Sequence, residues 1–363
     1  MPGQDFIELP DVPPARVVVA PAHHAVHSLM LLTGAHDLSG FNEWVSRTRD
    51  ALTPTERAHH KLVILGFFHA IVPERNWSSF PAYLDHLAVT DPVALRDRML
   101  DVYIHMTPCD DCPKDVEVIT DMEAVLKDAD SYLDFLLSRF SAKVVDEEME
   151  REAYTYVADP PAMQNLIVSH LREMWDGHFK AEWDRVEPML RDSERAFRQL
   201  DLSGMSRIDS WRLITGHEMS DEKWQTVHDM VEQIIYVPSA HVGPYVGKLW
   251  DIDKLWVLFG ARIPEGVQYD APDLSRAEIV VRLSALADDT RLRLLKLVAE
   301  EGELRSQDIM ERLGLSQSAA SRQLKQLSAT GYLNERRCEG AKCYTFNSER
   351  LEDTCGALSA FLA

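Results

Sequence analysis

Three residues with metal-binding side chains lie close together near the middle of the first half of the chain. His105, Cys109 and Cys112 supply one imidazole and two thiols just where Pro108 would end a helical pattern. Zinc prefers these ligand types, although a closed zinc site needs a fourth ligand. The Cys-x-x-Cys pair is also typical of a redox dithiol, and two loop cysteines without a chemical role are the third interpretation.

A second pair of cysteines, Cys338 and Cys343, flanks the turn formers Glu339, Gly340 and Ala341. If Gly340 and Ala341 form a two-residue turn, the cysteines face each other with α-carbons about 4.5 Å apart. That separation permits a disulfide, so a thiol switch is one hypothesis for this segment. The five cysteines of the chain, an odd number without framework spacing, favour reduced thiols as the alternative.

Histidines and tryptophans are confined to the first 273 residues, which hold all 14 His and all 8 Trp. His23 and His27 have the spacing of one helix face, so a metal site is one interpretation and ordinary polar side chains are the other. Six tryptophans would either line a pocket for an apolar or cationic ligand or, the favoured interpretation, belong to the core. These are Trp175, Trp183, Trp211, Trp224, Trp250 and Trp256.

The side chains best suited to reading DNA lie on one predicted helix, residues 317–329. Ala320, Leu324 and Leu327 recur at helical spacing and are expected to face inward. The rest of this helix carries short polar, amide and basic side chains that suit base edges and phosphates. They are Gln317, Ser318, Ser321, Arg322, Lys325 and Gln326, and an ordinary solvated helix face is the alternative interpretation.

The elements around this helix form a recognisable order. A helix over 307–313 precedes it, Gly314 supplies the turn, and Ser316 is placed to cap the second helix, which is typical of a helix-turn-helix. Two alternating strands, 332–338 and 342–346, follow as a hairpin. The hairpin would act as a basic wing against phosphates through Arg336, Arg337 and Lys342.

The sequence before residue 274 predicts a large, mostly helical domain with a small sheet. Three short β-branched or aromatic runs, at 16–20, 233–237 and 254–259, would pair the beginning of this domain with its end. Apolar spacing predicts helices over 41–52, 55–70, 92–106, 116–127, 130–140, 160–175 and 180–200. A proline-containing connector separates this domain from the next, so we expect domains at 1–262 and 274–363 with a linker at 263–273.

The charge of the chain is unevenly distributed. Its net charge of −21 belongs to residues 1–273, whereas residues 274–363 hold 13 basic and 13 acidic residues. An acidic body repels phosphate, so DNA contact is expected only on one face of the C-terminal part. The sequence shows neither a long uncharged apolar run nor a signal peptide, which predicts a cytoplasmic protein without a membrane partner.

The C-terminal motifs together resemble the ArsR family of bacterial repressors. The resemblance implies a homodimer that binds a palindromic operator and releases it when a small-molecule inducer binds. Gln323 stands where the family commonly has histidine, which affects operator preference, and residues 302–309 lack the cysteines of the family's metalloid site. The matching stretches are Leu283–Leu295, Leu313–Leu327, Gly331–Leu333, and Arg336, Arg337, Gly340 and Tyr344.

The N-terminal run over 16–44 is similar to uncharacterised helical domains that precede such modules, which implies a sensor. The leading hypothesis is therefore a ligand-responsive, dimeric repressor without catalytic activity, with helices near 277–286 and 349–361 at the dimer interface. The first alternative is a metal- or thiol-sensing regulator, with zinc as the candidate cofactor. The second is an enzyme with an attached regulatory module, for which four common catalytic motifs are missing from the sequence. The predicted DNA contacts are Ser316, Gln317, Ser318, Ser321, Arg322, Gln323, Lys325, Arg336, Arg337 and Lys342.

Overall fold

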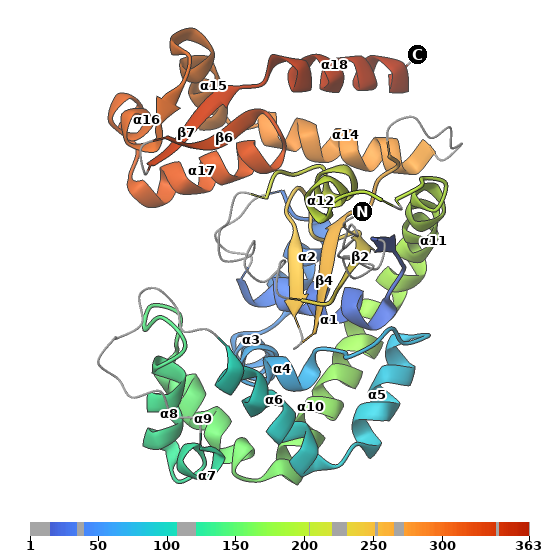
Figure 1. Cartoon of the computed structure of the whole chain (residues 1–363), viewed down its shortest axis with the longest axis vertical. Coiled ribbons are helices and arrows are strands. Elements are labelled where there is room, and N and C mark those ends of the chain that lie inside the picture. The colour runs from blue at the N-terminus through green and yellow to red at the C-terminus, as the bar shows by residue number, and fades with distance from the viewer. Residues whose placement is uncertain are drawn as a thin grey trace, which may run out of the picture.

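The computed structural model describes residues 15–34, 40–106, 121–202, 204–219, 231–250, 253–264, 272–338 and 341–362. Figure 1 shows a helical N-terminal part that contains a small sheet, with a domain of helices and a hairpin at one end of it. The predicted fold class is confirmed: the chain is mainly helical, with a small sheet before residue 264 and a winged helix-turn-helix after residue 272.

The N-terminal part has long helices around one sheet. Its strands are β1 (Arg16–Val17), β2 (Gln233–Ser239), β3 (Gly247–Trp250) and β4 (Lys254–Gly260). Two π-helical segments, η1 (Leu62–Gly66) and η2 (Trp175–Phe179), adjoin α-helices. The α-helices are α1 (Pro21–Gly34), α2 (Glu43–Ala51), α3 (Pro54–Lys61), α4 (Phe68–Ile71), α5 (Phe80–Val89), α6 (Pro92–His105), α7 (Met122–Val125), α8 (Ala129–Leu137), α9 (Glu147–Val157), α10 (Pro160–Met174), α11 (Lys180–Phe197) and α12 (Arg207–Thr215).

Several of these helices begin where the sequence places a capping residue before a proline. Thr53 forms a capping box with Glu56 at the start of α3, and Asp91 and Asp159 cap α6 and α10. The single helix predicted over 55–70 is wrong, because η1 divides it into α3 and α4. The widened turn lies where the backbone closely approaches α9, since a Cβ at Gly66 would be 3.2 Å from the Cβ of Ala153.

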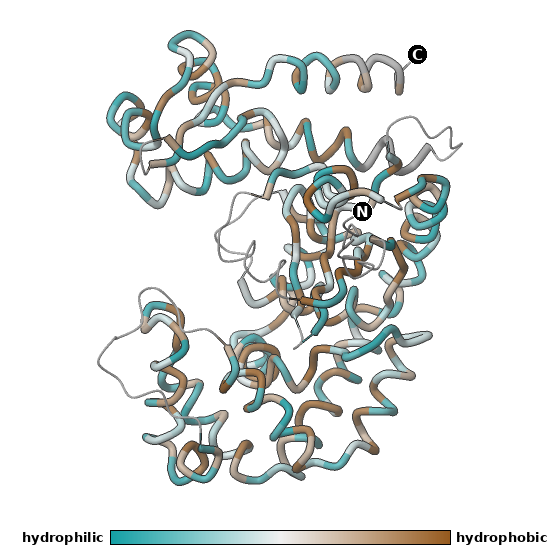
Figure 2. The backbone as a smooth tube through the Cα atoms, in the orientation of Figure 1, coloured by the Kyte–Doolittle hydropathy of each residue, from teal (hydrophilic) through white to brown (hydrophobic). Residues whose placement is uncertain are grey.

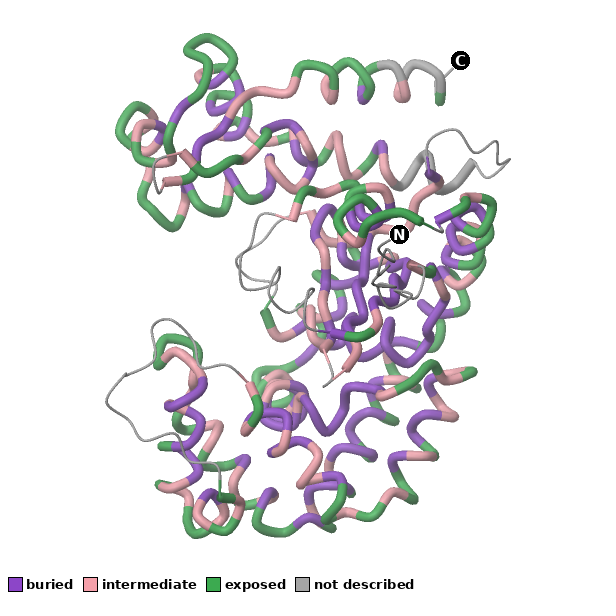
Figure 3. Tube along the Cα trace, viewed as in Figure 1, coloured by how far each residue is buried: buried purple, intermediate pink, exposed green. Residues whose placement is uncertain are grey.

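The four-stranded sheet joins the two ends of the N-terminal part, as predicted. Its order is β1-β2-β4-β3; β1, β2 and β4 are parallel and β3 is antiparallel to β4. Both faces are buried, because Ile234 and Tyr236 pack toward α11 and α12 while Ile235 and Val237 pack on the opposite side. Strands β2 and β4 are accordingly largely brown in Figure 2 and largely purple in Figure 3. Strand β3 was not predicted, since it contributes only four residues.

The C-terminal domain places a three-stranded sheet beside five helices. The sheet order is β5-β7-β6, and both pairings are antiparallel. Its core includes Leu294, Leu324, Leu327 and Tyr332, each at most 1% exposed. Its elements are α14 (Pro272–Leu286), α15 (Asp289–Glu301), β5 (Leu304–Arg305), α16 (Ser306–Leu313), α17 (Gln317–Ala329), β6 (Leu333–Cys338), β7 (Ala341–Phe346) and α18 (Ser348–Leu362).

Candidate nucleic-acid interface and buried polar clusters

The helix-turn-helix consists of α16 and α17, joined by a short turn. Gly314 ends α16 with a φ of +64°, in the left-handed region where glycine carries no Cβ penalty. Ser316 then caps α17, because its hydroxyl accepts a hydrogen bond from the Ala319 amide at 3.3 Å. The local sequence therefore fixes the start and direction of α17 independently of any ligand.

The N-terminal half of α17 presents an exposed polar face. Gln317, Ser318, Ser321 and Arg322 are all exposed, whereas Ala320 is buried as predicted. Arg322 has no carboxylate partner among the described residues. Amide, hydroxyl and guanidinium groups on one helix face are the donors and acceptors that a major groove requires.

The C-terminal half of α17 is held by Arg291 of α15. The Arg291 guanidinium is 6% exposed, and its Nη1 donates to Oε1 of Gln323 at 3.1 Å and to Oε1 of Gln326 at 3.0 Å. The expectation that Gln326 is exposed is wrong, because this side chain is 2% exposed and turned toward Arg291. Gln323, the predicted base contact, also points its amide oxygen inward in this arrangement.

The same half of α17 contacts the N-terminal part. The Lys325 ammonium lies 5.8 Å from the ring centre of Tyr245, within cation–π range. A Cβ at Gly40 would be 3.1 Å from Nε2 of Gln326, so the backbone passes close to this helix. Lys325, predicted to contact DNA, is thus exposed but also engaged by the N-terminal part.

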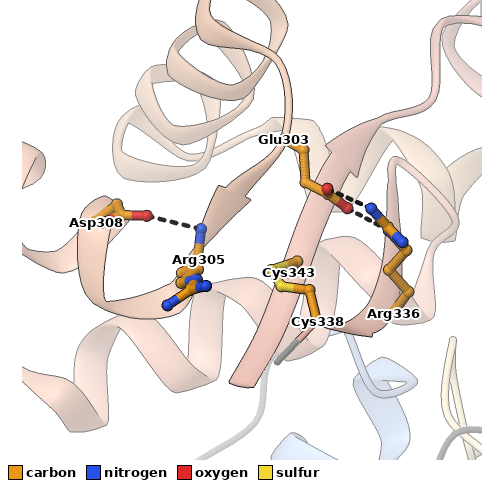
Figure 4. Close-up of a disulfide and its surroundings, with 6 residues drawn as sticks. All are labelled: Glu303, Arg305, Asp308, Arg336, Cys338 and Cys343. Carbon is orange, nitrogen blue, oxygen red and sulfur yellow. Dashed lines mark hydrogen bonds and ion pairs between the residues drawn. A yellow bond between two sulfur atoms is a disulfide. The ribbon is translucent and has the colours of Figure 1, made fainter. Parts of the chain in front are cut away.

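The wing is the β6–β7 hairpin, and its basic residues Arg336 and Lys342 have carboxylate partners. Arg336 forms an ion pair with Glu303 (Figure 4), and the Lys342 ammonium is 2.6 Å from a carboxylate oxygen of Glu335. These pairs are largely exposed and therefore weak, so both cations remain able to exchange partners. Arg337 is exposed on the same hairpin.

The wing cysteines form a disulfide in this structure (Figure 4). The predicted geometry is wrong in register, because Cys338 lies opposite Ala341, and Cys343 lies opposite Arg336. The α-carbons of the two cysteines are 6.0 Å apart, compared with the expected 4.5 Å, a separation that still permits the bond. The structure thus differs from the expectation of reduced thiols, since a diagonal pair across the hairpin also brings the sulfurs together.

The proposed metal ligands are only partly within the described residues. His105 ends α6, is exposed, and hydrogen-bonds through Nδ1 to the Asp101 carbonyl at 2.9 Å. Cys109 and Cys112 lie outside the described residues. Within the ranges that are described, no group of three or more His, Cys, Asp or Glu side chains has the arrangement of a metal site.

A cluster of histidines lies in the core of the N-terminal part. His241 is fully buried; its Nε2 is 2.9 Å from a Glu182 carboxylate oxygen and its Nδ1 is 2.7 Å from the Ser28 hydroxyl. Burial lowers the pKa of His241, although the neighbouring Glu182 opposes this change. A neutral His241 protonated on Nε2 can donate to Glu182, while the single Ser28 proton is shared between Nδ1 of His241 and the His24 carbonyl, which lies 2.7 Å from the same hydroxyl.

The remaining histidines of this cluster are on α1. Burial lowers the pKa of both His23 and His27 to about 3, so they are neutral at physiological pH. His27 fills the space beside Gly247 so tightly that a Cβ there would be 2.0 Å from its Nε2. The predicted placement of His23 and His27 on one helix is confirmed, and their surroundings are those of a packed core.

Three residues that matter to these clusters were not singled out from the sequence. Each of Arg291, Glu182 and His241 has a partner at least 32 positions away. Their only sequence signal is a charged or titratable side chain within an otherwise apolar pattern. Trp183, Trp211 and Trp256 are buried, and Figure 3 shows α1, β2 and β4 in the interior of the N-terminal part.

The fold and the exposed face of α17 define the C-terminal domain as a winged helix-turn-helix DNA-binding domain. Residues 288–335 match the family model described as "Bacterial regulatory protein, arsR family". The C-terminal domain therefore belongs to the ArsR family, as the sequence motifs predicted.

Individual known proteins are similar to part of the chain. The arsenic resistance transcriptional regulator ArsR1 of Pseudomonas putida is 50% identical over 52 residues, which are 14% of this chain and 41% of that protein. The crystal structure of NolR from Sinorhizobium fredii is 33% identical and covers 26% of this chain and 95% of its own, with a TM-score of 0.21. The homodimeric winged helix-turn-helix domain of Mb0332 from Mycobacterium bovis, a possible ArsR-family regulator, is 23% identical over 26% of this chain and 86% of its own, with a TM-score of 0.22.

Proposed function

We propose that this protein is a transcription regulator that binds operator DNA through α17 and the wing. The observation that carries the proposal is the exposed face of Gln317, Ser318, Ser321 and Arg322 at the capped end of α17. Membership of the C-terminal domain in the ArsR family supports the same function. On this proposal Arg322 reads base edges or phosphates, while Arg337 contacts phosphates flanking the groove.

The DNA-binding unit is proposed to be a homodimer. Helices α14 and α18 pack on each other along one edge of the molecule (Figure 1), where Val280 is 55% exposed and Phe361 is 49% exposed. Exposed apolar side chains on two neighbouring helices favour a surface that a second copy covers. Light scattering of a Val280→Glu variant is expected to give a monomer, and an unchanged dimer would contradict this interface.

Residues 1–262 are proposed to be the sensor, connected by the linker at 263–273 to the DNA-binding and dimerisation domain at 274–363. The contacts of Lys325 and Gln326 with the N-terminal part support this division, because they give the sensor direct access to the recognition helix. We infer that ligand binding to the sensor changes operator affinity, as in a cytoplasmic repressor without catalytic activity. Among the helices that the structure describes, none has the length and apolarity needed to cross a membrane.

The experiment that tests DNA binding is a mobility-shift titration of the full chain on its own upstream DNA, across a salt series. A variant carrying Arg322→Ala and Gln317→Ala is expected to bind at least about tenfold more weakly, since a good base contact contributes about 1–3 kcal/mol. Arg47→Ala, which removes an exposed arginine from α2, serves as the control and is expected to bind like the wild type. Equal affinity of the double variant and the control would refute the assigned recognition face.

Thiol-based regulation is a second candidate function, because Cys338 and Cys343 are bonded within the proposed DNA-contacting wing. A hairpin tied across its two strands would hold Arg337 in fewer orientations than a reduced one.

Zinc sensing through His105, Cys109 and Cys112 remains a further proposal. Elemental analysis of the purified protein and of its Cys109→Ser and Cys112→Ser variants tests zinc sensing. We expect a stoichiometric metal in the wild type that both variants lose. A wild type without metal, or variants with the same metal content as the wild type, would exclude zinc sensing.

A further inference from the structure

A cavity of about 110 Å³ lies between the N-terminal part and the C-terminal domain. Its wall on one side is formed by the carboxyl ends of the parallel strands β2 and β4 and by the end of α12. Its wall on the other side comes from α14, α18 and the end of α17. Ligands of open parallel sheets bind outside the carboxyl ends of the strands, so the position itself indicates a binding site.

The cavity is lined by three arginines from separate elements. Arg262 follows β4, Arg282 lies on α14 and Arg350 lies on α18. Glu278 is the carboxylate within the same lining, and Asp353 lies within electrostatic range of Arg350. Three guanidiniums against two carboxylates leave the junction positively charged, although residues 1–273 are strongly acidic.

Backbone carbonyls hold two of these guanidiniums in place. Arg262 Nη2 donates to the Leu213 carbonyl at 2.7 Å, and Arg350 Nε donates to the Thr330 carbonyl at 2.9 Å. Arg350 also lies over Gly331, where a Cβ would be 2.6 Å from its Nε. The guanidiniums are therefore positioned before any ligand arrives, which lowers the entropic cost of binding one.

The third guanidinium is paired with a carboxylate. Arg282 forms an ion pair with Glu278 one turn away on α14. Its Nε is buried without a hydrogen-bond partner among the described residues.

The electrostatics of the cavity favour an anion. Burial lowers the pKa of Arg350 below its ordinary value, and the nearby Arg282 and Arg262 contribute to the decrease. Burial also lowers the pKa of His217 to about 4, with further contributions from Arg262 and Arg350, so His217 is neutral at physiological pH. Like charges gathered in a partly buried site repel one another, and a bound anion would relieve that repulsion.

We propose that this cavity binds a small organic carboxylate, and that its occupancy is the signal passed to the recognition helix. Met189, Val281 and Ala329 supply apolar wall, which suits a short hydrocarbon body better than inorganic phosphate. A dry cavity of about 150 Å³ holds benzene, so the volume here accommodates a ligand of about four to six non-hydrogen atoms. The signalling half of the inference rests on the proposed DNA-binding function, whereas carboxylate binding does not.

The ligand would contact the recognition helix directly. Ala329 is the last residue of α17, and Thr330 is its C-cap and supplies the carbonyl that holds Arg350. A carboxylate bridging Arg262 and Arg350 would therefore connect the end of β4 to the end of α17. The position of the helix relative to the N-terminal part would then depend on occupancy of the cavity.

Isothermal titration calorimetry of the full chain with acetate, butyrate and succinate tests carboxylate binding. At least one of the three is expected to bind, and its neutral amide at least about tenfold more weakly, because charge-assisted hydrogen bonds contribute about 1.5–3 kcal/mol. Arg350→Gln is expected to weaken binding by a similar factor, and Ala329→Leu to abolish it by filling the cavity. Arg47→Gln is the matched control and is expected to bind like the wild type.

The results of these experiments test the carboxylate site separately from its proposed role in signalling. Binding of none of the three carboxylates, or binding that Arg350→Gln and Ala329→Leu leave unchanged while circular dichroism shows both variants folded, would overturn the site. Binding of inorganic phosphate alone would overturn the carboxylate assignment. If a carboxylate binds but leaves operator affinity unchanged, the signalling role is refuted. If the protein binds no DNA at all, the proposed function fails while calorimetry still decides the site.

Discussion

Replacement of Arg291 by methionine is expected to loosen the recognition helix without removing its DNA-facing side chains. The Arg291 guanidinium donates to the carbonyls of Ser284 and Ala285 and to the side-chain oxygens of Gln323 and Gln326. Methionine replaces the aliphatic part of arginine but donates no hydrogen bonds, so the variant leaves these four acceptors without the Arg291 donor. The perturbation therefore acts on the anchoring of α17 to α15 and to the end of α14.

The size of the expected loss in stability follows from how deeply the four acceptors of Arg291 are buried. Ala285 is fully buried and Gln326 is 2% exposed, whereas Ser284 and Gln323 are exposed enough to bind water instead. Two enclosed acceptors that lose their partner cost about 1–3 kcal/mol each, and the variant no longer carries the desolvation cost of a buried guanidinium, which offsets part of that sum. We expect the local free energy of opening to fall by about 3 kcal/mol.

Hydrogen–deuterium exchange of the full chain measures this change directly. A loss of about 3 kcal/mol corresponds to about a hundredfold faster exchange of protected amides in α15 and α17. Arg293→Met on the same helix is the matched control, because Arg293 is exposed, and its effect is expected to stay within about 0.5 kcal/mol. Exchange in Arg291→Met within threefold of the control would refute the view that Arg291 anchors α17.

Three further predictions concern the buried histidines and the wing. Gly247→Ala is expected to destabilise the protein by about 1–3 kcal/mol in urea titrations, since the new Cβ meets the immobile ring of His27, whereas Gly34→Ala, with open space around it, should not. The pKa of His27 falls from 6.5 in the unfolded chain to about 3 in the folded protein, so the free energy of unfolding is highest above pH 6.5 and decreases as the pH falls toward 3. At pH 5 the expected loss is about 2 kcal/mol. A thermal midpoint that stays constant from pH 7 to pH 5 would contradict this prediction. Dithiothreitol is expected to weaken operator binding roughly fivefold in mobility shifts, as the reduced wing regains about 1 kcal/mol of conformational freedom, and Cys338→Ser, which cannot bond to Cys343, should be insensitive to it.

The DNA-binding domain was largely predictable because its signals are local. Helix spacing, the turn at Gly314, the cap at Ser316 and the alternation of the wing each depend on residues within a few positions of one another. The same kind of signal predicted where α3, α6 and α10 begin. The sequence failed where packing overrides pattern, as in the helix that η1 divides and in the inward turn of Gln326.

The sequence alone thus determined the class of domain at the C-terminus, the residue types on its recognition helix and the separation of charge between the two parts. Tertiary structure decided which of those side chains are available to contact DNA, because it turns Gln326 toward Arg291 and brings Lys325 close to Tyr245. It also assembled the histidine–glutamate cluster and the arginine-lined cavity from residues distant in sequence. The physical reason is that hydrogen bonds and burial depend on distances in space, whereas a sequence pattern records only spacing along the chain.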